Sequence, residues 1–234
     1  MLYSDTLLIA LSFGIIPTVF WLLFWLYEDR ARPEPRGLIL RTFIAGMFVV
    51  PVVIPLQKAG FSLFGLGTVA FIIVSITEEI FKYVAARLTG LGSNENDEPL
   101  DPVIYMITAS LGFASVENTL FLLQDAQLGG TLYSLVVTGN LRFIGATLLH
   151  VVTSATVGVF ISLVFYRKKS IKKLFLLFGL ILAIILHTLF NLLIIHNINT
   201  SIFITFTFVW VSVIILLLMF EKIKTIRPFR RFRK

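Results

Sequence analysis

The sequence predicts an all-α protein: a polytopic bundle of about seven transmembrane helices. Of its 234 residues, 57% are hydrophobic and only 14% are charged, about half the charged fraction of a soluble domain. Its apolar runs are each near the roughly 20 residues that a helix needs to cross a bilayer. Because no soluble core of this size could bury them all, residues 1–234 are expected to form a single integral membrane domain.

The expected spans follow these apolar runs along the chain. The longest runs are Leu7–Tyr27, Leu38–Leu56, Phe64–Ala86, Ile171–Ile195 and Ile202–Phe220. With the less uniform stretches between them, they place seven spans at about 7–27, 38–57, 63–88, 102–124, 141–165, 172–196 and 202–221. Residues 132–140 leave three alternatives open: an interfacial segment, the start of a longer fifth helix, or an eighth crossing, which would need a very short hairpin. The first span lacks a preceding basic segment, so it is expected to be a true span and not a cleaved signal peptide.

Basic residues gather in alternate connections, and this predicts the orientation. The first and fifth connections and the C-terminal segment carry nearly all the Lys and Arg, whereas the opposite connections hold little more than Lys58. Lys and Arg are retained on the cytoplasmic side, so the N-terminus is expected outside the cell and the C-terminus in the cytoplasm. Residues 222–234 are expected to form a basic cytoplasmic tail on anionic lipid headgroups. The net charge of +7 could suggest a nucleic-acid partner, but nothing else in the chain supports nucleic-acid binding.

Several ionisable side chains fall inside the expected spans, where each costs about 2.5–3.5 kcal/mol on insertion scales. The third span contributes Glu78, Glu79 and Lys82, the fourth Glu117, the fifth His150, and the sixth His187 with Asn191. Arg142, at the start of the fifth span, is expected at the membrane interface. Groups on four separate helices can be satisfied only by converging. We therefore expect one buried polar site, lying toward the outer half of the bilayer in this orientation.

Each residue taken singly has a structural explanation. A lone His or Asn in a span is more often a hydrogen-bonding contact between helices than a catalyst. Glu78 and Lys82 are four residues apart, so they share a helix face and can form a structural ion pair. The combination favours a functional site, because two adjacent carboxylates with one nearby cation are unusual in a structural network.

Hydrolysis of a peptide bond is the chemistry that suits this set. A carboxylate removed from water is a better general base, so Glu78 or Glu79 could deprotonate a water while Lys82 keeps one of the pair ionised. His150 or His187 could bind or protonate the tetrahedral intermediate, and Asn191 could donate to its oxyanion.

A metal centre is a variant of the same chemistry. Two His and one Glu are a common catalytic zinc shell, and Glu117, His150 and His187 are the ligands expected here, with a glutamate of the third span as base. The sequence contains no HExxH motif, so a Zn²⁺ site would depend on distant helices converging. A metal-free glutamate mechanism stays open as the alternative.

A proton- or cation-coupled membrane transporter is the leading alternative function. Buried Glu, Lys and His side chains also form proton relays. The sequence shows no inverted repeat and no paired Gly/Pro-interrupted spans of the kind that transporters contain, so the protease hypothesis is favoured.

Four motifs, each on its own expected span, together resemble the PrsW family of intramembrane proteases. They are EExxK at Glu78–Lys82, FxxxE followed by Asn at Phe113–Asn118, His150, and HxxxN at His187–Asn191. The resemblance implies an endopeptidase, often classed with metallopeptidases, that makes the first cut in a membrane-anchored anti-sigma factor on its extracytoplasmic side. The CAAX prenyl proteases are more distantly similar. Their pattern has Arg at the position of Lys82 and His at that of Glu117, which argues against prenyl-protein cleavage.

Overall fold

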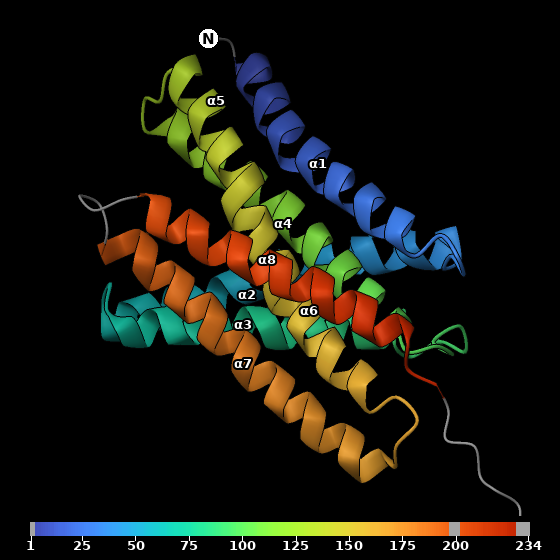
Figure 1. Ribbon diagram of the computed structural model, residues 1–234. Helices are drawn as coiled ribbons and strands as arrows, with labels where there is room; N and C mark the ends of the chain where they lie inside the picture. Colours follow the sequence, from blue (N-terminus) through green and yellow to red (C-terminus); the bar gives the residue numbers. More distant parts are fainter. Residues whose placement is uncertain (1–2, 197–201, 228–234) are drawn as a thin grey trace, which may run out of the picture.

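The computed structural model describes residues 3–196 and 202–227, and this part of the chain is a bundle of long helices without a strand (Figure 1). Its elements are α1 (Tyr3–Glu28), α2 (Arg36–Phe64), α3 (Thr68–Leu88), α4 (Asp101–Gln127), α5 (Leu132–Leu141), the π-helical turn η1 (Arg142–Ala146), α6 (Thr147–Leu163), α7 (Lys169–His196) and α8 (Ile202–Lys224). The predicted polytopic all-α bundle is confirmed. Of the predicted basic tail, residues 228–234 lie outside the described residues.

Six helical segments are long and apolar enough to cross a membrane. They are Thr6–Glu28, Arg36–Phe64, Asp101–Gln127, Leu132–Leu163, Lys169–Ile195 and Phe203–Lys224. Helix α3, the remaining expected span, is less apolar because it carries two glutamates, a lysine and an arginine. It packs between α2 and α7, and Glu78, Glu79 and Lys82 are among its buried residues. These three charges therefore face the protein, as charged groups inside a membrane must, whereas Arg87 in the last turn is exposed.

The fifth span is longer than the predicted range of 141–165. Helices α5 and α6 and the turn η1 form one continuous helix, Leu132–Leu163. Residues 132–140 are thus the start of a longer fifth helix and form no separate crossing. Within η1 the N–H of Thr147 donates to the carbonyl of Arg142, five residues back. This wider turn is a π-bulge, a local feature that is frequent at functional sites.

Helix α4 is central in the bundle and packs against α1, α2 and α6. Glycines allow it to approach its neighbours closely: a Cβ added at Gly112 would lie 1.9 Å from the carbonyl oxygen of Phe43 in α2. A Cβ added at Gly46 of α2 would lie 2.0 Å from the carbonyl oxygen of Ala109 in α4. Small residues at such positions let helix backbones pack tightly inside a membrane. This contact fixes α4, and with it Glu117, against the rest of the bundle.

The replacement Gly112→Ala is expected to destabilise the protein by about 1–3 kcal/mol or more, because its methyl group would overlap backbone that cannot move alone. Thermal unfolding in detergent would measure the effect. Gly37→Ala, in the same interface partner α2, is the control, since no atom lies within 4 Å of the added Cβ. Equal melting temperatures for the two variants would contradict the close α2–α4 contact.

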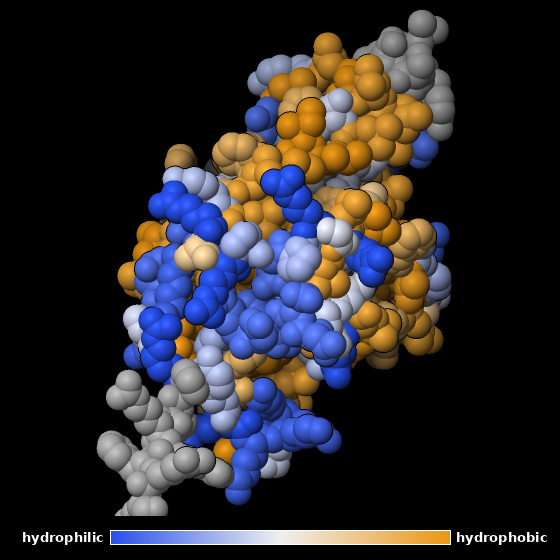
Figure 2. Space-filling view, turned by 90° about the vertical axis from the view of Figure 1, so that its right-hand side faces the viewer, coloured by the Kyte–Doolittle hydropathy of each residue, from blue (hydrophilic) through white to orange (hydrophobic). Residues whose placement is uncertain are grey.

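The α1–α2, α3–α4 and α6–α7 connections lie together with the end of α8 at one end of the bundle (Figure 1). Arg32 of the α1–α2 connection pairs with Glu98 of the α3–α4 connection at 3.2 Å. Lys224 at the end of α8 pairs with Glu28 at 3.4 Å. Figure 2 shows hydrophilic residues gathered on this face, with apolar surface beyond it. The connections that carry the basic residues are therefore neighbours in space, as an alternating arrangement of spans requires.

Asp29, in the α1–α2 connection, is a buried carboxylate with pH-dependent energetics. It is 2% exposed, and its Oδ2 makes no hydrogen bond to a described residue. Burial, together with the carboxylates of Glu98 and Asp101, raises the pKa of Asp29 to about 7 against the opposing charge of Lys224. The folded pKa lies above the ordinary value of 3.8, so the folded state favours the protonated acid. Asp29 therefore destabilises the protein increasingly as the pH rises from about 4 to about 7.

The replacement Asp29→Asn is accordingly expected to raise the melting temperature clearly at pH 8 and by much less at pH 5. Thermal unfolding of the detergent-solubilised protein at the two pH values checks this. Asp97→Asn is the matched control, because Asp97 is an exposed carboxylate in a neighbouring connection. An Asp29→Asn effect of the same size at both pH values would show that the ionisation of Asp29 is not its cause.

Candidate functional site

The structure brings together, where α3, α4, α6 and α7 meet, all the ionisable residues that the sequence places in the site. Glu78, Glu79, Lys82, His150 and His187 are each at most 2% exposed. Glu117 is the most accessible member, with 19% of its side chain exposed. Asn191 lies beside the cluster on the wall of a cavity. The expected convergence of four helices is therefore present.

Lys82 is the cation at the centre of the cluster. Its Nζ donates to Glu79 Oε1 at 2.9 Å and to Glu78 Oε2 at 3.3 Å, and it lies 2.9 Å from His150 Nδ1. Because Lys82 follows the two glutamates by four and three residues, it reaches both from the next helical turn. The same ammonium group lies 4.3 Å from the centre of the Phe113 ring. The expected Glu78–Lys82 ion pair is thus present, and Lys82 shares it with Glu79.

Glu79 has its hydrogen-bonding capacity filled by the protein. Its Oε1 accepts from Lys82 at 2.9 Å, Thr153 at 3.0 Å and His187 Nδ1 at 2.8 Å. Its Oε2 accepts from Ser154 at 3.0 Å. A carboxylate has about four lone-pair sites, and this side chain is fully buried. Glu79 therefore orients its neighbours, and it does not line the cavity from which a water would approach.

Glu117 is held by a guanidinium and an imidazole. Its Oε2 accepts from Arg142 Nη2 at 2.7 Å and lies 2.9 Å from His150 Nε2. Arg142 stands in the π-turn η1, and its Nε donates to Asn118 Oδ1 at 2.7 Å. The Asn118 amide in turn donates to Thr147 Oγ1 at 2.9 Å. Arg142 is therefore part of the site, a role that the sequence did not assign to it.

Each histidine has one ring nitrogen held by a carboxylate and the other turned toward Glu78. His187 uses Nδ1 for Glu79, and its Nε2 lies 3.7 Å from Glu78 Oε2. His150 uses Nε2 for Glu117, and its Nδ1 lies 3.9 Å from Glu78 Oε2. One ligand atom from each of Glu78, His150 and His187 lies within 4.8 Å of the others. Two imidazoles and a carboxylate, with each imidazole oriented by a further carboxylate, match the donor set of a catalytic zinc site.

The structure therefore groups Glu78, and not Glu117, with the two histidines. Glu117 is occupied by Arg142, whereas Glu78 faces both imidazoles. The Lys82 ammonium contacts Glu78 and His150, so a metal ion among these groups would leave Lys82 with Glu79 as its main partner. The tight Lys82–Glu79 bond allows that arrangement without an unpaired buried charge.

A cavity of about 340 Å³ gives access to one side of the cluster. Its polar wall is made by Gln57, Glu78, Glu117, Arg142, His150, His187 and Asn191, while Glu79 and Lys82 lie behind it. The apolar wall includes four phenylalanines, Phe61, Phe71, Phe121 and Phe190. The lining residues of α2 and α7 come from their C-terminal halves and those of α3 from its N-terminal half. The cavity therefore lies toward the end of the bundle opposite to the basic connections.

Sequence reasoning assigned no role to two polar residues of this wall or to one behind it. Gln57 donates to Glu78 Oε1 at 3.0 Å, and Arg142 and Thr153 bond Glu117 and Glu79. A polar side chain beside an apolar run is the same signal that identified Glu117, so Gln57 and Arg142 could have been predicted as site residues. Thr153 carries no such signal, because hydroxyl side chains in spans commonly bond to their own helix.

Comparison with known proteins adds an independent line of evidence. The chain matches the model of the PrsW family of intramembrane metalloproteases over residues 34–219. It is similar to proteins named Protease PrsW from Geobacillus kaustophilus (strain HTA426), 31% identical over 121 residues, or 49% of this chain and 52% of the relative. The same name is carried by relatives from Oceanobacillus iheyensis, 34% identical over 122 residues (51% and 56%), and Halalkalibacterium halodurans, 29% identical over 188 residues (77% and 81%). The chain thus spans about half the length of the first two relatives, and no solved structure matches it.

Proposed function

The chain belongs to the PrsW family of intramembrane metalloproteases, and from this premise we propose that it hydrolyses peptide bonds of membrane-anchored proteins. The observation that carries the proposal is the buried group of Glu78, His150 and His187, whose ligand atoms lie within 4.8 Å of one another. This group borders a cavity inside the bundle, as hydrolysis of a bond within or beside the bilayer requires.

Glu78, His150 and His187 would hold the metal ion, and zinc is the ion that two imidazoles and one carboxylate favour. When bound, such an ion polarises a peptide carbonyl and acidifies a bound water. Glu79 and Glu117 would act by orientation, because each fixes one imidazole so that its other nitrogen faces Glu78.

Proton transfer is assigned to Glu117. Its Oε2 is bound to Arg142 and His150, whereas its Oε1 makes no hydrogen bond to a described residue and belongs to a side chain on the cavity wall. Glu117 would accept a proton as the water oxygen attacks the peptide carbonyl, and it would deliver that proton to the departing amine nitrogen. Arg142 and His150, both bound to Oε2, hold the carboxyl group in place through both steps.

Oxyanion stabilisation is assigned to Asn191. Its side chain lines the cavity and has no hydrogen bond to a described residue, so its amide N–H is available to a ligand. A donor held in a water-poor cavity stabilises charge that develops on the carbonyl oxygen. His187 and Asn191 lie four residues apart on α7, and this spacing puts both on one helix face.

The substrate class follows from where the cavity lies. With the basic connections in the cytoplasm, the cavity is in the outer half of the bilayer, the N-terminus is outside and the C-terminus is cytoplasmic. A single-pass membrane protein with a scissile bond near the outer membrane surface fits this position. The family resemblance adds a membrane-anchored anti-sigma factor as the specific substrate.

The proposal is tested by sequencing new protein N-termini in membranes of cells that express the wild type or a His150→Ala/His187→Ala variant. Membrane proteins cut at or near the outer end of a span should appear with the wild type and be absent with the variant. Arg41→Gln, an exposed change far from the cavity, is the control and should behave as the wild type. Identical N-termini from the wild type and the double variant would refute the protease assignment, and ion flux through proteoliposomes would then support a transporter.

A further inference from the structure

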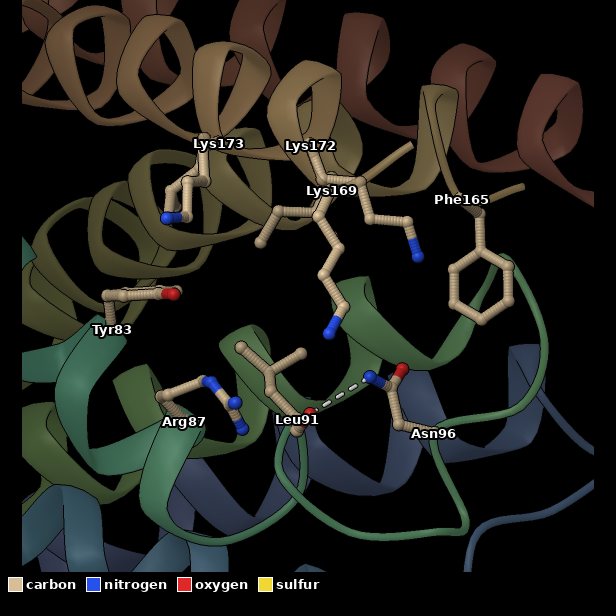
Figure 3. Close-up of a pocket in the computed structure, with 10 residues that line it drawn as sticks. Tyr83, Arg87, Leu91, Asn96, Phe165, Lys169, Lys172 and Lys173 are labelled. Atoms are coloured by element: carbon tan, nitrogen blue, oxygen red, sulfur yellow. Dashed lines mark hydrogen bonds between the residues drawn. The ribbon is translucent and has the colours of Figure 1, made fainter. Parts of the chain in front are cut away.

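A second pocket, of about 420 Å³, lies at the opposite end of the bundle from the catalytic cavity. Figure 3 shows this pocket in close-up. It is bounded by the C-terminal ends of α3 and α6, the α3–α4 connection and the first turns of α7. Its lining residues are Tyr83, Arg87, Leu91, Asn96, Ile161, Phe165, Lys169, Lys172, Lys173 and Leu176. Figure 3 shows Lys169 and Arg87 extending into the space from opposite walls.

The charge of this pocket is one-sided. Arg87, Lys169, Lys172 and Lys173 are four cations, and no acidic residue lines the pocket. Among the described residues, none of the four forms an ion pair, and Lys172 contacts only the face of the Phe165 ring, at 4.9 Å. Like charges gathered around one concave space repel one another, so a bound anion would relieve an existing electrostatic cost.

The start of α7 adds to the positive potential. Helix α7 is 28 residues long and has no acidic residue in its first turn, whereas three of its first five residues are lysines. The N-terminus of a helix carries a partial positive charge and unpaired N–H groups, so lysines there are unfavourable without a counter-ion. The lysines and the helix end therefore favour the same kind of ligand, a compact anion such as a phosphate group.

The pocket also has features of a lipid site. Ile161, Phe165 and Leu176 give it an apolar wall, and Leu174 and Leu177 of α7 expose 49% and 53% of their surface just beyond the lysines. This apolar surface is where the acyl chains of a bilayer would begin. Basic pockets between transmembrane helices on the cytoplasmic side recognise phospholipid headgroups.

Two polar side chains complete the lining. The Asn96 amide donates to the Leu91 carbonyl at 3.0 Å, while its Oδ1 is buried without a hydrogen-bond partner among described residues. The hydroxyl of Tyr83 also faces this region (Figure 3). A hydroxyl-bearing headgroup could donate to Asn96 Oδ1 while its phosphate contacts the cations.

From these features we propose that this pocket binds the phosphate of an anionic phospholipid headgroup, at the membrane surface that carries the basic connections. Phosphatidylglycerol, which bears one phosphate and free hydroxyls, is the probe of this chemistry. The pocket shares no lining residue with the catalytic cavity. A lipid bound there would hold together the ends of α3, α6 and α7 that lie away from the catalytic residues.

Native mass spectrometry of the detergent-solubilised protein, titrated with phosphatidylglycerol, tests the proposal. A Lys169→Gln/Lys172→Gln/Lys173→Gln variant should bind this lipid about 100-fold more weakly, since each cation near a membrane surface is worth about 1 kcal/mol. The matched control is Arg41→Gln/Lys168→Gln/Lys222→Gln, which removes the same charge at exposed positions outside the pocket. The control should retain the wild-type affinity within about threefold. Equal weakening in the two triple variants would show that only general attraction operates and would overturn the site.

Two further arms identify the source of the phosphate and guard against misfolding. Phosphatidylcholine, whose phosphate is neutralised by its own choline, and inorganic phosphate should fail to displace phosphatidylglycerol at equal concentration. Displacement by inorganic phosphate would overturn the lipid as the source and assign the pocket to a soluble anion. Arg87→Gln, a single exposed change in α3, should weaken lipid binding about fivefold if the pocket is correct, and unchanged binding in this variant would contradict the proposal.

Discussion

Glu78→Gln is expected to lower the rate of proteolysis by about 10³-fold while leaving the protein folded. The change removes a proposed metal ligand, and losing a direct ligand is expected to cost more than the about 10–100-fold lost with an outer-shell partner. The amide keeps the shape of the side chain and can still bond Gln57, which lies 3.0 Å from Glu78 Oε1. Lys82 keeps its 2.9 Å bond to Glu79, so no buried cation loses its only partner. Cleavage of a single-pass substrate in proteoliposomes measures the rate, and the melting temperature reports the fold.

Gln57→Met distinguishes the contribution of the Gln57–Glu78 hydrogen bond from that of the Glu78 carboxylate itself. It removes the hydrogen bond to Glu78 without removing the carboxylate, so a loss of about tenfold in rate is expected. Full activity of Glu78→Gln would exclude Glu78 from the centre. Inactivity combined with a strongly lowered melting temperature would assign it a structural role.

Glu79→Gln is expected to have its largest effect on stability. Glu79 accepts bonds from Lys82, Thr153, Ser154 and His187 in a fully buried position. Removing the charge of one partner in a buried ion pair costs about 3–5 kcal/mol, because the remaining charge is left poorly compensated. We therefore expect a much lower melting temperature than for Glu78→Gln, together with weaker activity as His187 loses its orientation.

A double-mutant cycle tests the assignment of that cost to Lys82. Lys82→Met removes the buried ammonium, so the Glu79→Gln/Lys82→Met variant should recover part of the stability lost in Glu79→Gln. Ser154→Ala, which deletes one neutral donor to Glu79, should cost only about 1 kcal/mol. Additive losses in the double variant would mean that Glu79 and Lys82 do not stabilise each other.

Much of this fold and site could be predicted from the sequence, for physical reasons. Water-free surroundings force apolar residues into spans of fixed length, so the long runs located most of the helices. The same surroundings make every intramembrane charge conspicuous, so Glu78, Glu79, Lys82, Glu117 and both histidines could be identified before their contacts were known. The convergence of their four helices followed from the cost of leaving any of them alone.

The pairing within the cluster could not be predicted. Spacing along one helix cannot say which carboxylate faces which histidine on another, and the sequence favoured Glu117 as the ligand where the structure places Glu78. The ion pair between Arg142 and Glu117 determines this pairing, and Arg142 stands in a π-turn that no sequence pattern predicted. The start of the fifth helix was left open among three alternatives, because Thr138 and Asn140 make residues 132–140 less apolar than the rest of the span.

Elemental analysis of the purified protein tests the grouping of Glu78 with the two histidines most directly. The wild type is expected to contain about one zinc per chain, and both Glu78→Gln and His150→Ala/His187→Ala should lose it. Glu117→Gln should retain most of the metal under the same conditions, since an orienting residue costs only about 10–100-fold in affinity. Metal that is lost from Glu117→Gln but kept by Glu78→Gln would contradict the centre described here, as would a wild type that contains no metal in any preparation.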